Sequence, residues 1–232
     1  MSNWKLEAEQ LAIKEYPREA CGLVLISKGK EVFFPCVNIS QELHNFIIDP
    51  IQYAEAEDKG EIVGIFHSHC NKSAAPSVAD LSSCEKTRKK WYIYATPVNV
   101  WNEFSPNGFE PPLIGREFCH GILDCYSLVR DWYRSEMGIM IPDFNRDEGW
   151  WHKGQNLYIE NFEKAGFVET DKLEYGVGLL MQLHSPVVNH AAVYIGDNKI
   201  MHHMYNRLSS RDVYGGMYRK NTIKMVRYAK RD

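Results

Sequence analysis

The sequence lacks the cysteine pattern of a disulfide-bonded or zinc-ribbon protein. Its six cysteines stand at irregular intervals along 232 residues, and no two of them form a CxxC pair. A chain of this length that is not cysteine-dense does not depend on a disulfide framework, so we expect reduced thiols and a cytoplasmic setting. The absence of CxxC also argues against an all-thiolate structural zinc site.

Long hydrophobic runs are also missing. The longest apolar stretches, such as residues 176–183, are far shorter than the roughly 20 residues that a helix needs to cross a bilayer. We therefore predict no membrane-spanning segment. Residues 1–17 lack the basic start, the apolar centre and the small-residue cleavage site of a secretory signal, so we expect no export by the general route.

The chain has no excess of positive charge. Its 27 Lys and Arg residues are outnumbered by 30 Asp and Glu residues, which gives a formal net charge of −3, and the basic residues are scattered. Because a phosphate backbone is bound mainly through clustered basic side chains, we predict no nucleic acid partner.

What the chain does have is enough apolar sequence for two compact domains. It is 44% hydrophobic and 12% aromatic. Residues 104–115, FSPNGFEPPLIG, contain three prolines and two glycines without apolar periodicity, which is typical of a linker. We predict an α+β protein with one domain in residues 1–105, a linker in 106–115 and a second domain in 116–232.

The order of predicted elements differs between the two halves. In the first half, periodicity and turn residues predict helices at 4–16, 51–60 and from Ser77 onward, and strands at 21–27, 31–39, 46–50, 61–69 and 91–98. In the second half they predict a helix at 124–137 and strands at 190–197, 199–204 and 222–229. No internal repeat is present.

One candidate site follows the predicted strand 61–69. On a strand, residues two apart project to the same side, so His67 and His69 can reach one point, and Asp80 lies about one turn into the next helix. Two imidazoles and a carboxylate suit Zn²⁺ and leave a fourth position for water, as in catalytic zinc sites. Glu19 is a candidate general base. The alternative is an ordinary polar turn at a strand end.

The residues around this site resemble a known motif. HSHCNKSAAPSVAD fits H-x-H-x7-S-x2-D, and PREACG fits an upstream P-x-E-x-C-G element. Both resemble the JAMM, or MPN, zinc metallopeptidases, whose fold is a sheet flanked by helices. This resemblance implies that His67, His69 and Asp80 hold zinc, that Glu19 is the base that acts on water at the metal, and that Ser77 steadies the oxyanion.

A second candidate site lies in the other half. Cys125 begins a predicted helix, where the aligned peptide dipoles favour a thiolate. His190 opens a strand, and a hairpin turn leads to His202, so His190 can act as the base and His202 can orient it. The alternative is a structural cysteine.

These residues are similar to the NlpC/P60 family of papain-like cysteine peptidases, which cut peptide crosslinks in bacterial cell walls. DCYSLV resembles the segment D-C-S-G-L-V of that family, and NHAAVYIGDNKIMH preserves a twelve-residue step from His190 to His202. The chain departs from the pattern at Tyr126 and Ser127, which replace Ser-Gly, and at Leu113, which stands where the family often has tyrosine.

The two modules in this order resemble the tail assembly proteins of long-tailed bacteriophages. This resemblance implies a two-domain peptidase whose partners are phage tail-tip proteins and bacterial cell-wall peptides. It also implies a location in the host cytoplasm during assembly and at the virion tail tip afterwards. Two alternatives stay open: a structural tail component with one or both sites inactive, and a deubiquitinase-like or sulfur-carrier-processing JAMM enzyme.

Overall fold

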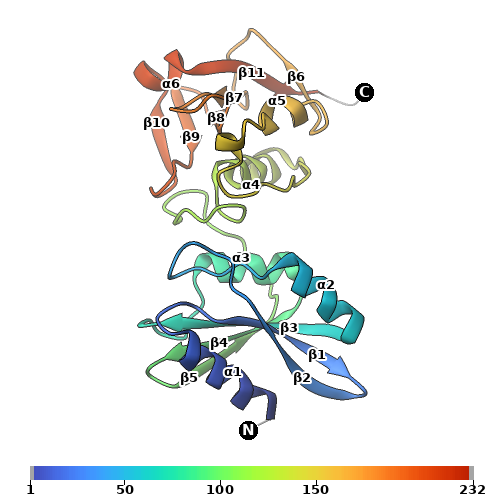
Figure 1. Ribbon diagram of the computed structural model, residues 1–232. Helices are drawn as coiled ribbons and strands as arrows, with labels where there is room; N and C mark the ends of the chain where they lie inside the picture. Colours follow the sequence, from blue (N-terminus) through green and yellow to red (C-terminus); the bar gives the residue numbers. More distant parts are fainter. Residues whose placement is uncertain (1–2, 230–232) are drawn as a thin grey trace. The chain divides into compact units, whose positions relative to one another are not determined.

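The computed structural model describes residues 3–229, which divide into two compact units. The N-terminal unit is Met1–Glu110 and the C-terminal unit is Pro111–Asp232 (Figure 1). Both combine a sheet with helices, so the predicted α+β class is confirmed. The boundary between the two units in the sequence lies between residues 110 and 111, inside the proline-rich stretch of residues 104–115.

The N-terminal unit is built on a five-stranded sheet in the order β2-β1-β3-β4-β5. Its strands are β1 (Cys21–Ser27), β2 (Lys30–Cys36), β3 (Glu61–Cys70), β4 (Lys90–Thr96) and β5 (Val100–Phe104). Neighbouring strands are antiparallel except β3 and β4, which are parallel. A parallel pair needs a crossover, and helix α3 (Val78–Thr87) supplies it.

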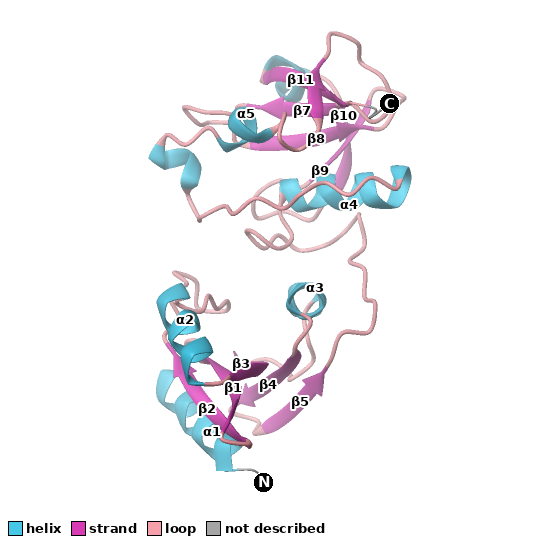
Figure 2. Cartoon of the chain, turned by 90° about the vertical axis from the view of Figure 1, so that its right-hand side faces the viewer, coloured by secondary structure: helices cyan, strands magenta, loops and turns pink. Residues whose placement is uncertain are grey.

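Helices cover both faces of this sheet (Figure 2). Helix α1 (Asn3–Glu15) lies on one face, and α2 (Pro50–Lys59) and α3 lie on the other. Side chains alternate along β1 accordingly: Leu23 and Leu25 pack in the core with α2 and α3, whereas Val24 packs with α1. The sheet is therefore buried on both sides.

The first turn of α3 is held by a reciprocal cap. The Ser77 hydroxyl accepts a hydrogen bond from the backbone N–H of Asp80, and the Asp80 carboxylate accepts one from the N–H of Ser77. This capping box satisfies two backbone donors that the helix leaves unpaired. It also fixes the position of Asp80 relative to the end of β3.

The C-terminal unit is built on a six-stranded antiparallel sheet in the order β10-β9-β8-β7-β11-β6. The strands are β6 (Phe167–Glu169), β7 (Gly178–Met181), β8 (His190–Tyr194), β9 (Lys199–His202), β10 (Ser210–Val213) and β11 (Thr222–Tyr228). Helix α4 (Cys125–Met137) is accompanied by the short helices η1 (Trp150–Lys153), α5 (Leu157–Asn161) and α6 (Gly216–Lys220).

Helix α4 buries one stripe against the sheet. Leu128 and Trp132 of this stripe are 0% and 1% exposed, and they share a core with Ala191 and Val193 of β8. The helix begins after Asp124, whose side chain caps it, and ends at Gly138, which has a positive φ of 67°. The stripe matches the apolar spacing in the sequence.

Several expected strands differ from the structure. The predicted strand at 46–50 is wrong: within residues 3–229 this stretch forms only an isolated bridge between Asn38 and Ile48. Asp49 caps the helix that begins at Pro50, so the chain turns there instead of extending. Strands β5, β6, β7 and β10 were not predicted, because three to five residues are too few to show a period of two.

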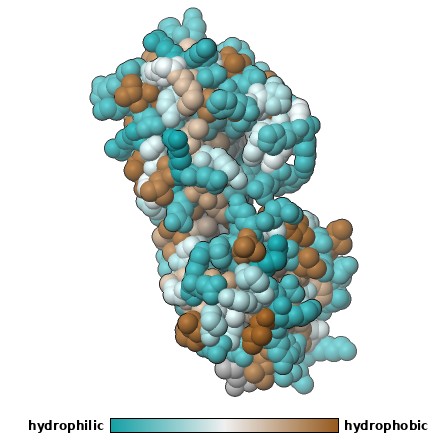
Figure 3. Space-filling view, turned by 60° about the vertical axis from the view of Figure 1, so that its left-hand side comes forward, coloured by the Kyte–Doolittle hydropathy of each residue, from teal (hydrophilic) through white to brown (hydrophobic). Residues whose placement is uncertain are grey.

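No helix within residues 3–229 is long and apolar enough to cross a membrane. On the face seen in Figure 3, exposed apolar side chains are dispersed among polar ones.

Candidate functional site

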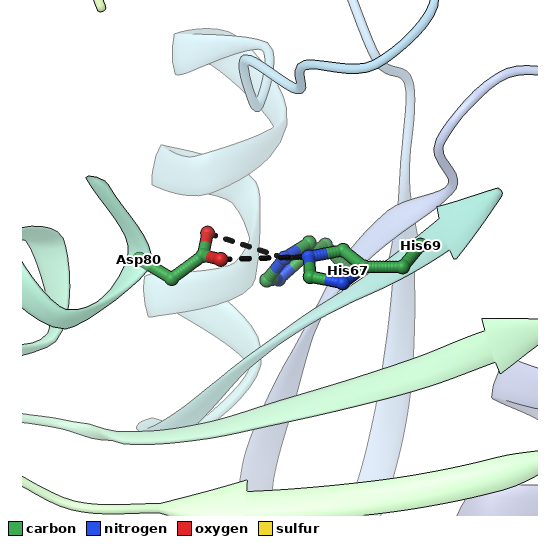
Figure 4. Close-up of side chains that lie close together, drawn as sticks. All are labelled: His67, His69 and Asp80. Atoms are coloured by element: carbon green, nitrogen blue, oxygen red, sulfur yellow. Dashed lines mark hydrogen bonds and ion pairs between the residues drawn. The ribbon is translucent and has the colours of Figure 1, made fainter. Parts of the chain in front are cut away.

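Three side chains of the N-terminal unit converge on one point (Figure 4). His67 and His69 project from the same side of β3, and Asp80 faces them from α3. The two Nε2 atoms lie 3.1 Å apart, and the Asp80 oxygens lie 3.3 Å from Nε2 of His67 and 3.4 Å from Nε2 of His69. The structure thus brings together the three residues predicted to be ligands.

Neighbouring groups orient both imidazoles. The Nδ1 atom of His69 lies 2.8 Å from the carbonyl oxygen of Ser73, which can only accept, so Nδ1 carries the proton and Nε2 of the neutral ring has a free lone pair. The ring of Phe46 stacks on that of His67, with centroids 4.5 Å apart and planes at 18°. Both Nε2 atoms are held toward Asp80.

The donor set fits a tetrahedral zinc ion. Two ligand atoms about 2.0–2.1 Å from a tetrahedral centre lie roughly 3.3–3.4 Å apart, by simple geometry. The three separations of 3.1, 3.3 and 3.4 Å are close to that value. Two buried lone-pair nitrogens at this distance repel each other unless a proton or a cation lies between them. Three protein ligands leave one tetrahedral position for water or substrate.

Glu19 and Ser77 occupy different surroundings. Glu19 is 4% exposed; burial raises the pKa of its carboxyl group, and the charges of His67 and His69 oppose that rise. Ser77 is exposed, and its hydroxyl oxygen accepts from the Asp80 N–H at 3.1 Å, which leaves the hydroxyl proton available to donate. The predicted roles of Glu19 as base and Ser77 as oxyanion donor stay predictions.

Cys125 is the first residue of α4, but its thiol is not a ready thiolate. Its Sγ lies 3.1 Å from the phenolic oxygen of Tyr158. Burial raises the pKa of the thiol, and the charge of Asp124 adds to the rise. Desolvation by burial thus opposes the thiolate that the helix N-terminus favours, and the role of Cys125 as nucleophile stays a prediction.

His190 and His202 are joined by the register of two strands. His190 begins β8 and His202 ends β9, where it stands opposite Ala192. This pairing places His190 Nε2 3.1 Å from His202 Nδ1. Burial lowers the pKa of His190 to about 3, with a smaller contribution from His202, so the ring is neutral. His203 instead contacts the carbonyl oxygen of Arg207 at 3.0 Å.

A pocket of about 170 Å³ is lined by both Cys125 and His190. Its walls are largely aromatic and include Phe118, Trp151 and Tyr205. Within residues 3–229 no hydrogen bond joins the thiol to His190; the thiol contacts Tyr158. The two candidate residues therefore share a cavity without a preformed ion pair.

Two functional candidates escaped the sequence analysis. Asp212 on β10 lies with its Oδ2 2.9 Å from His202 Nε2, and the Tyr218 hydroxyl donates to the same oxygen at 2.9 Å. The available signal was a further hairpin after His202, whose return strand passes beside β9. That strand has only four residues, SRDV, so its pattern is weak.

A buried ion pair ties a long loop to the start of α4. Arg146 Nε lies 2.9 Å from Asp124 Oδ2, and the side chains are 6% and 4% exposed. The Asp124 carboxylate also accepts from the N–H groups of Ser127 and Gly121. The pair therefore anchors Arg146, in the stretch between α4 and η1, beside Cys125.

Comparison with known families agrees with these two folds. The family described as prokaryotic homologs of the JAB domain matches residues 4–106, and the NlpC/P60 family matches residues 115–227. The two family matches define a two-module chain with a JAB/MPN-like domain first and an NlpC/P60 domain second. The predicted fold class is confirmed at this level.

Two relatives are similar over most of the chain. Tail tip assembly protein K of Escherichia phage N15 is 38% identical over 221 residues, which covers 94% of this chain and 90% of the relative. Tail tip assembly protein K of Escherichia phage lambda is 36% identical over 183 residues, which covers 78% and 89%. This chain belongs to the family of tail tip assembly protein K, as its resemblance to phage tail proteins predicted.

Solved structures are less similar. The crystal structure of a JAB1/MPN domain protein from Archaeoglobus fulgidus is 24% identical in sequence and has a TM-score of 0.30. The match covers 45% of this chain and 83% of that protein.

Proposed function

We propose that this chain is a peptidase of the phage tail tip with two separate sites. The cysteine site would cut the γ-D-glutamyl-diamino acid bond of bacterial cell-wall stem peptides, and the zinc site would cut an amide or isopeptide bond. One observation carries the proposal: Cys125 and His190 line the same pocket, while Nε2 of His190 contacts His202.

In the cysteine site, His190 serves as base and then as acid. Its free Nδ1 accepts the thiol proton as Sγ of Cys125 bonds to the substrate carbonyl carbon. The C–N bond breaks, and the proton on His190 passes to the departing amine. Water then attacks the thioacyl carbon and gives a proton to His190, which returns it to sulfur as the C–S bond breaks. The acid product leaves and the thiol is restored.

The resting site favours a neutral pair. Burial raises the pKa of Cys125 and lowers that of His190, so both groups are uncharged before substrate binds. Proton transfer therefore accompanies bond formation instead of preceding it. A thiol of this kind is protected from side reactions until a substrate carbonyl is in place.

In the zinc site, His67, His69 and Asp80 would hold the metal. When bound, Zn²⁺ supplies a Lewis acid that polarises a carbonyl group and lowers the pKa of water. The buried carboxyl group of Glu19 would hold and return the proton that moves in the reaction. The Ser77 hydroxyl retains a free proton with which to donate to an oxyanion.

The relatives and the chemistry of the cysteine site support a proposed location and proposed partners. Both named relatives are tail tip assembly proteins, which supports phage tail-tip proteins as partners. We place the chain in the host cytoplasm during assembly and at the virion tail tip afterwards. There the cysteine site would open peptidoglycan locally as DNA enters the cell.

The test compares the wild type with Glu19→Gln and Cys125→Ala on purified cell-wall peptides and on host lysate, with products identified by mass. We expect Cys125→Ala to lose stem-peptide cleavage and Glu19→Gln to retain it. Cys119→Ala is a matched control, because Cys119 is another partly exposed thiol of the same unit. Stem-peptide cleavage by Cys125→Ala would contradict the assignment.

A specific observation favours a second function for the zinc site alone. His67, His69 and Asp80 are 1%, 6% and 8% exposed, and Phe46 covers one imidazole. A metal so enclosed would stabilise the fold without turnover. Loss of stability on metal removal, together with no cleavage product that depends on Glu19, would establish this structural role.

A further inference from the structure

A line of hydrogen bonds runs from His190 away from the pocket. His190 Nε2 contacts His202 Nδ1 at 3.1 Å, and His202 Nε2 contacts Asp212 Oδ2 at 2.9 Å. The Tyr218 hydroxyl donates to the same carboxylate oxygen. His202 is completely buried, whereas the Asp212 side chain is 39% exposed on β10, the edge strand of the sheet.

The donors and acceptors along this line have only one consistent assignment. Burial raises the pKa of Asp212, but hydrogen bonds from His202 and Tyr218 outweigh it and hold the pKa below its usual value. An ionised carboxylate only accepts, so Nε2 of His202 must carry a proton. Burial lowers the pKa of His202, so its ring is neutral and Nδ1 has a lone pair. That lone pair accepts from His190 Nε2–H.

The tautomer of His202 determines which nitrogen of His190 carries the proton. With its proton on Nε2, neutral His190 has a free lone pair on Nδ1, the atom that must take the Cys125 proton. If His202 carried its proton on Nδ1 instead, His190 Nε2 would become the acceptor and Nδ1 would be protonated. A base of that tautomer cannot remove the thiol proton.

We propose that Asp212 is a positioning residue that acts through two imidazole rings: it fixes the tautomer of His202 and thereby that of His190. This inference rests on the proposed cysteine peptidase function. The carboxylate also stabilises the imidazolium that forms when His190 takes a proton, because its negative charge polarises the hydrogen bonds that link the two residues.

Among the described residues 3–229, no other group near His202 can take the place of Asp212 as acceptor. Besides His190, the charged or titratable groups that act on His202 are Asp212 of β10 and Arg207 of the preceding loop, and Tyr218 of α6 packs edge-on against its ring. Arg207 can only donate, and the Tyr218 hydroxyl is engaged with Asp212. His203, the remaining group that acts on His190, contacts the Arg207 carbonyl oxygen.

Nitrogen NMR of the full chain tests the tautomer without any substrate. With ¹⁵N-labelled histidine, and His190→Gln for assignment, we expect Nε2 of His190 to be protonated and Nδ1 to be free in the wild type. Asp212→Asn removes the charged acceptor and turns one of the two side-chain oxygens into an NH₂ donor; with that donor against His202 Nε2, we expect the His190 proton to move to Nδ1. Arg211→Gln, a matched change on the same strand opposite Met201, leaves the wild-type tautomer.

Kinetics on cell-wall peptides provide the second measurement. We expect Asp212→Asn to lower kcat roughly 10- to 100-fold with KM nearly unchanged, because the substrate pocket is intact while the base has the wrong tautomer. Arg211→Gln keeps the carboxylate and should keep both the tautomer and most of kcat. A purely structural role of Asp212 would alter thermal stability and leave the nitrogen spectrum unchanged.

The two proposals fail in different ways. A wild type with Nδ1 of His190 protonated overturns the inference even if no variant folds, and so does an Asp212→Asn spectrum like that of the wild type. A wild type that has the expected tautomer but cleaves no wall peptide contradicts the proposed function and leaves the role of Asp212 in setting the tautomer supported.

Discussion

The phenolic oxygen of Tyr158 lies 3.1 Å from Sγ of Cys125, where a thiol–imidazole hydrogen bond would be expected in a preformed catalytic pair. Tyr158 is buried and Cys125 is partly exposed, and desolvation raises the pKa of both groups. A phenol that donates to sulfur stabilises the thiolate relative to the thiol. Tyr158 therefore counteracts part of the desolvation that keeps the nucleophile protonated.

Alkylation measures this balance. Because burial raises its pKa, Cys125 should react slowly with iodoacetamide at pH 7 and faster as the pH passes the usual range of a thiol. Tyr158→Phe removes a hydrogen bond to a charged group, worth about 1.5 kcal/mol, so the rate at fixed pH should fall roughly tenfold. Mass analysis of the Cys125 peptide gives the rate, with the Cys119 peptide as internal reference. Rapid alkylation of Cys125 near pH 6 would contradict a raised pKa of its thiol.

Removing one partner of the ion pair between Asp124 and Arg146 should lower the free energy of unfolding strongly. Arg146→Ala leaves a carboxylate that is 4% exposed without its cation, so we expect a loss of about 3 kcal/mol in the free energy of unfolding of the C-terminal unit. Calorimetry of the full chain measures the shift of that transition. Arg211→Ala, on the exposed edge strand, should change stability by less than about 0.5 kcal/mol. Equal effects of the two substitutions would be inconsistent with a buried pair.

The same pair predicts a pH dependence of stability. Burial raises the pKa of Asp124, but Arg146 and the N–H of Ser127 outweigh it and hold the pKa below the unfolded value of 3.8. A carboxyl group with a depressed folded pKa contributes its full stability above the unfolded pKa. That stability is lost as the pH falls through the lower folded pKa. Unfolding from pH 7 to pH 2 should therefore show a smaller acid loss in Asp124→Asn than in the wild type.

Zinc content tests the three ligands directly. We expect about one Zn²⁺ per wild-type chain by elemental analysis and a large loss in His67→Ala, because two remaining donors hold zinc poorly. His44→Ala is a matched control, since His44 is exposed and has no part in the cluster. Full occupancy in His67→Ala would reject the assignment.

The sequence predicted this triad because its geometry is local. His67 and His69 need only the alternation of one strand, and Asp80 needs only the cap at Ser77 that begins α3. Local rules of this kind are readable from spacing. The hairpin between His190 and His202 is local in the same sense, and the register joins the two rings as expected.

Contacts between residues far apart in the sequence could not be predicted. Tyr158 reaches Cys125 across 33 residues, and Arg146 reaches Asp124 across 22, through a stretch without regular periodicity. Asp212 lies on a strand too short to predict. The direction of the Cys125 pKa depends on burial by these distant side chains, which the helix N-terminus alone does not reveal.

Phe46 should control how quickly the zinc site exchanges its metal. Its ring stacks on one face of His67, with centroids 4.5 Å apart, and shields that face from solvent. Phe46→Ala keeps all three ligand atoms but removes the cover, so we expect unchanged zinc content and at least about tenfold faster removal by a chelator. Phe34→Ala is a matched control, because Phe34 packs against the same core and is not stacked on His67. If both variants release zinc at the same rate, general loosening of the core explains the release, and the stacked ring is not a gate.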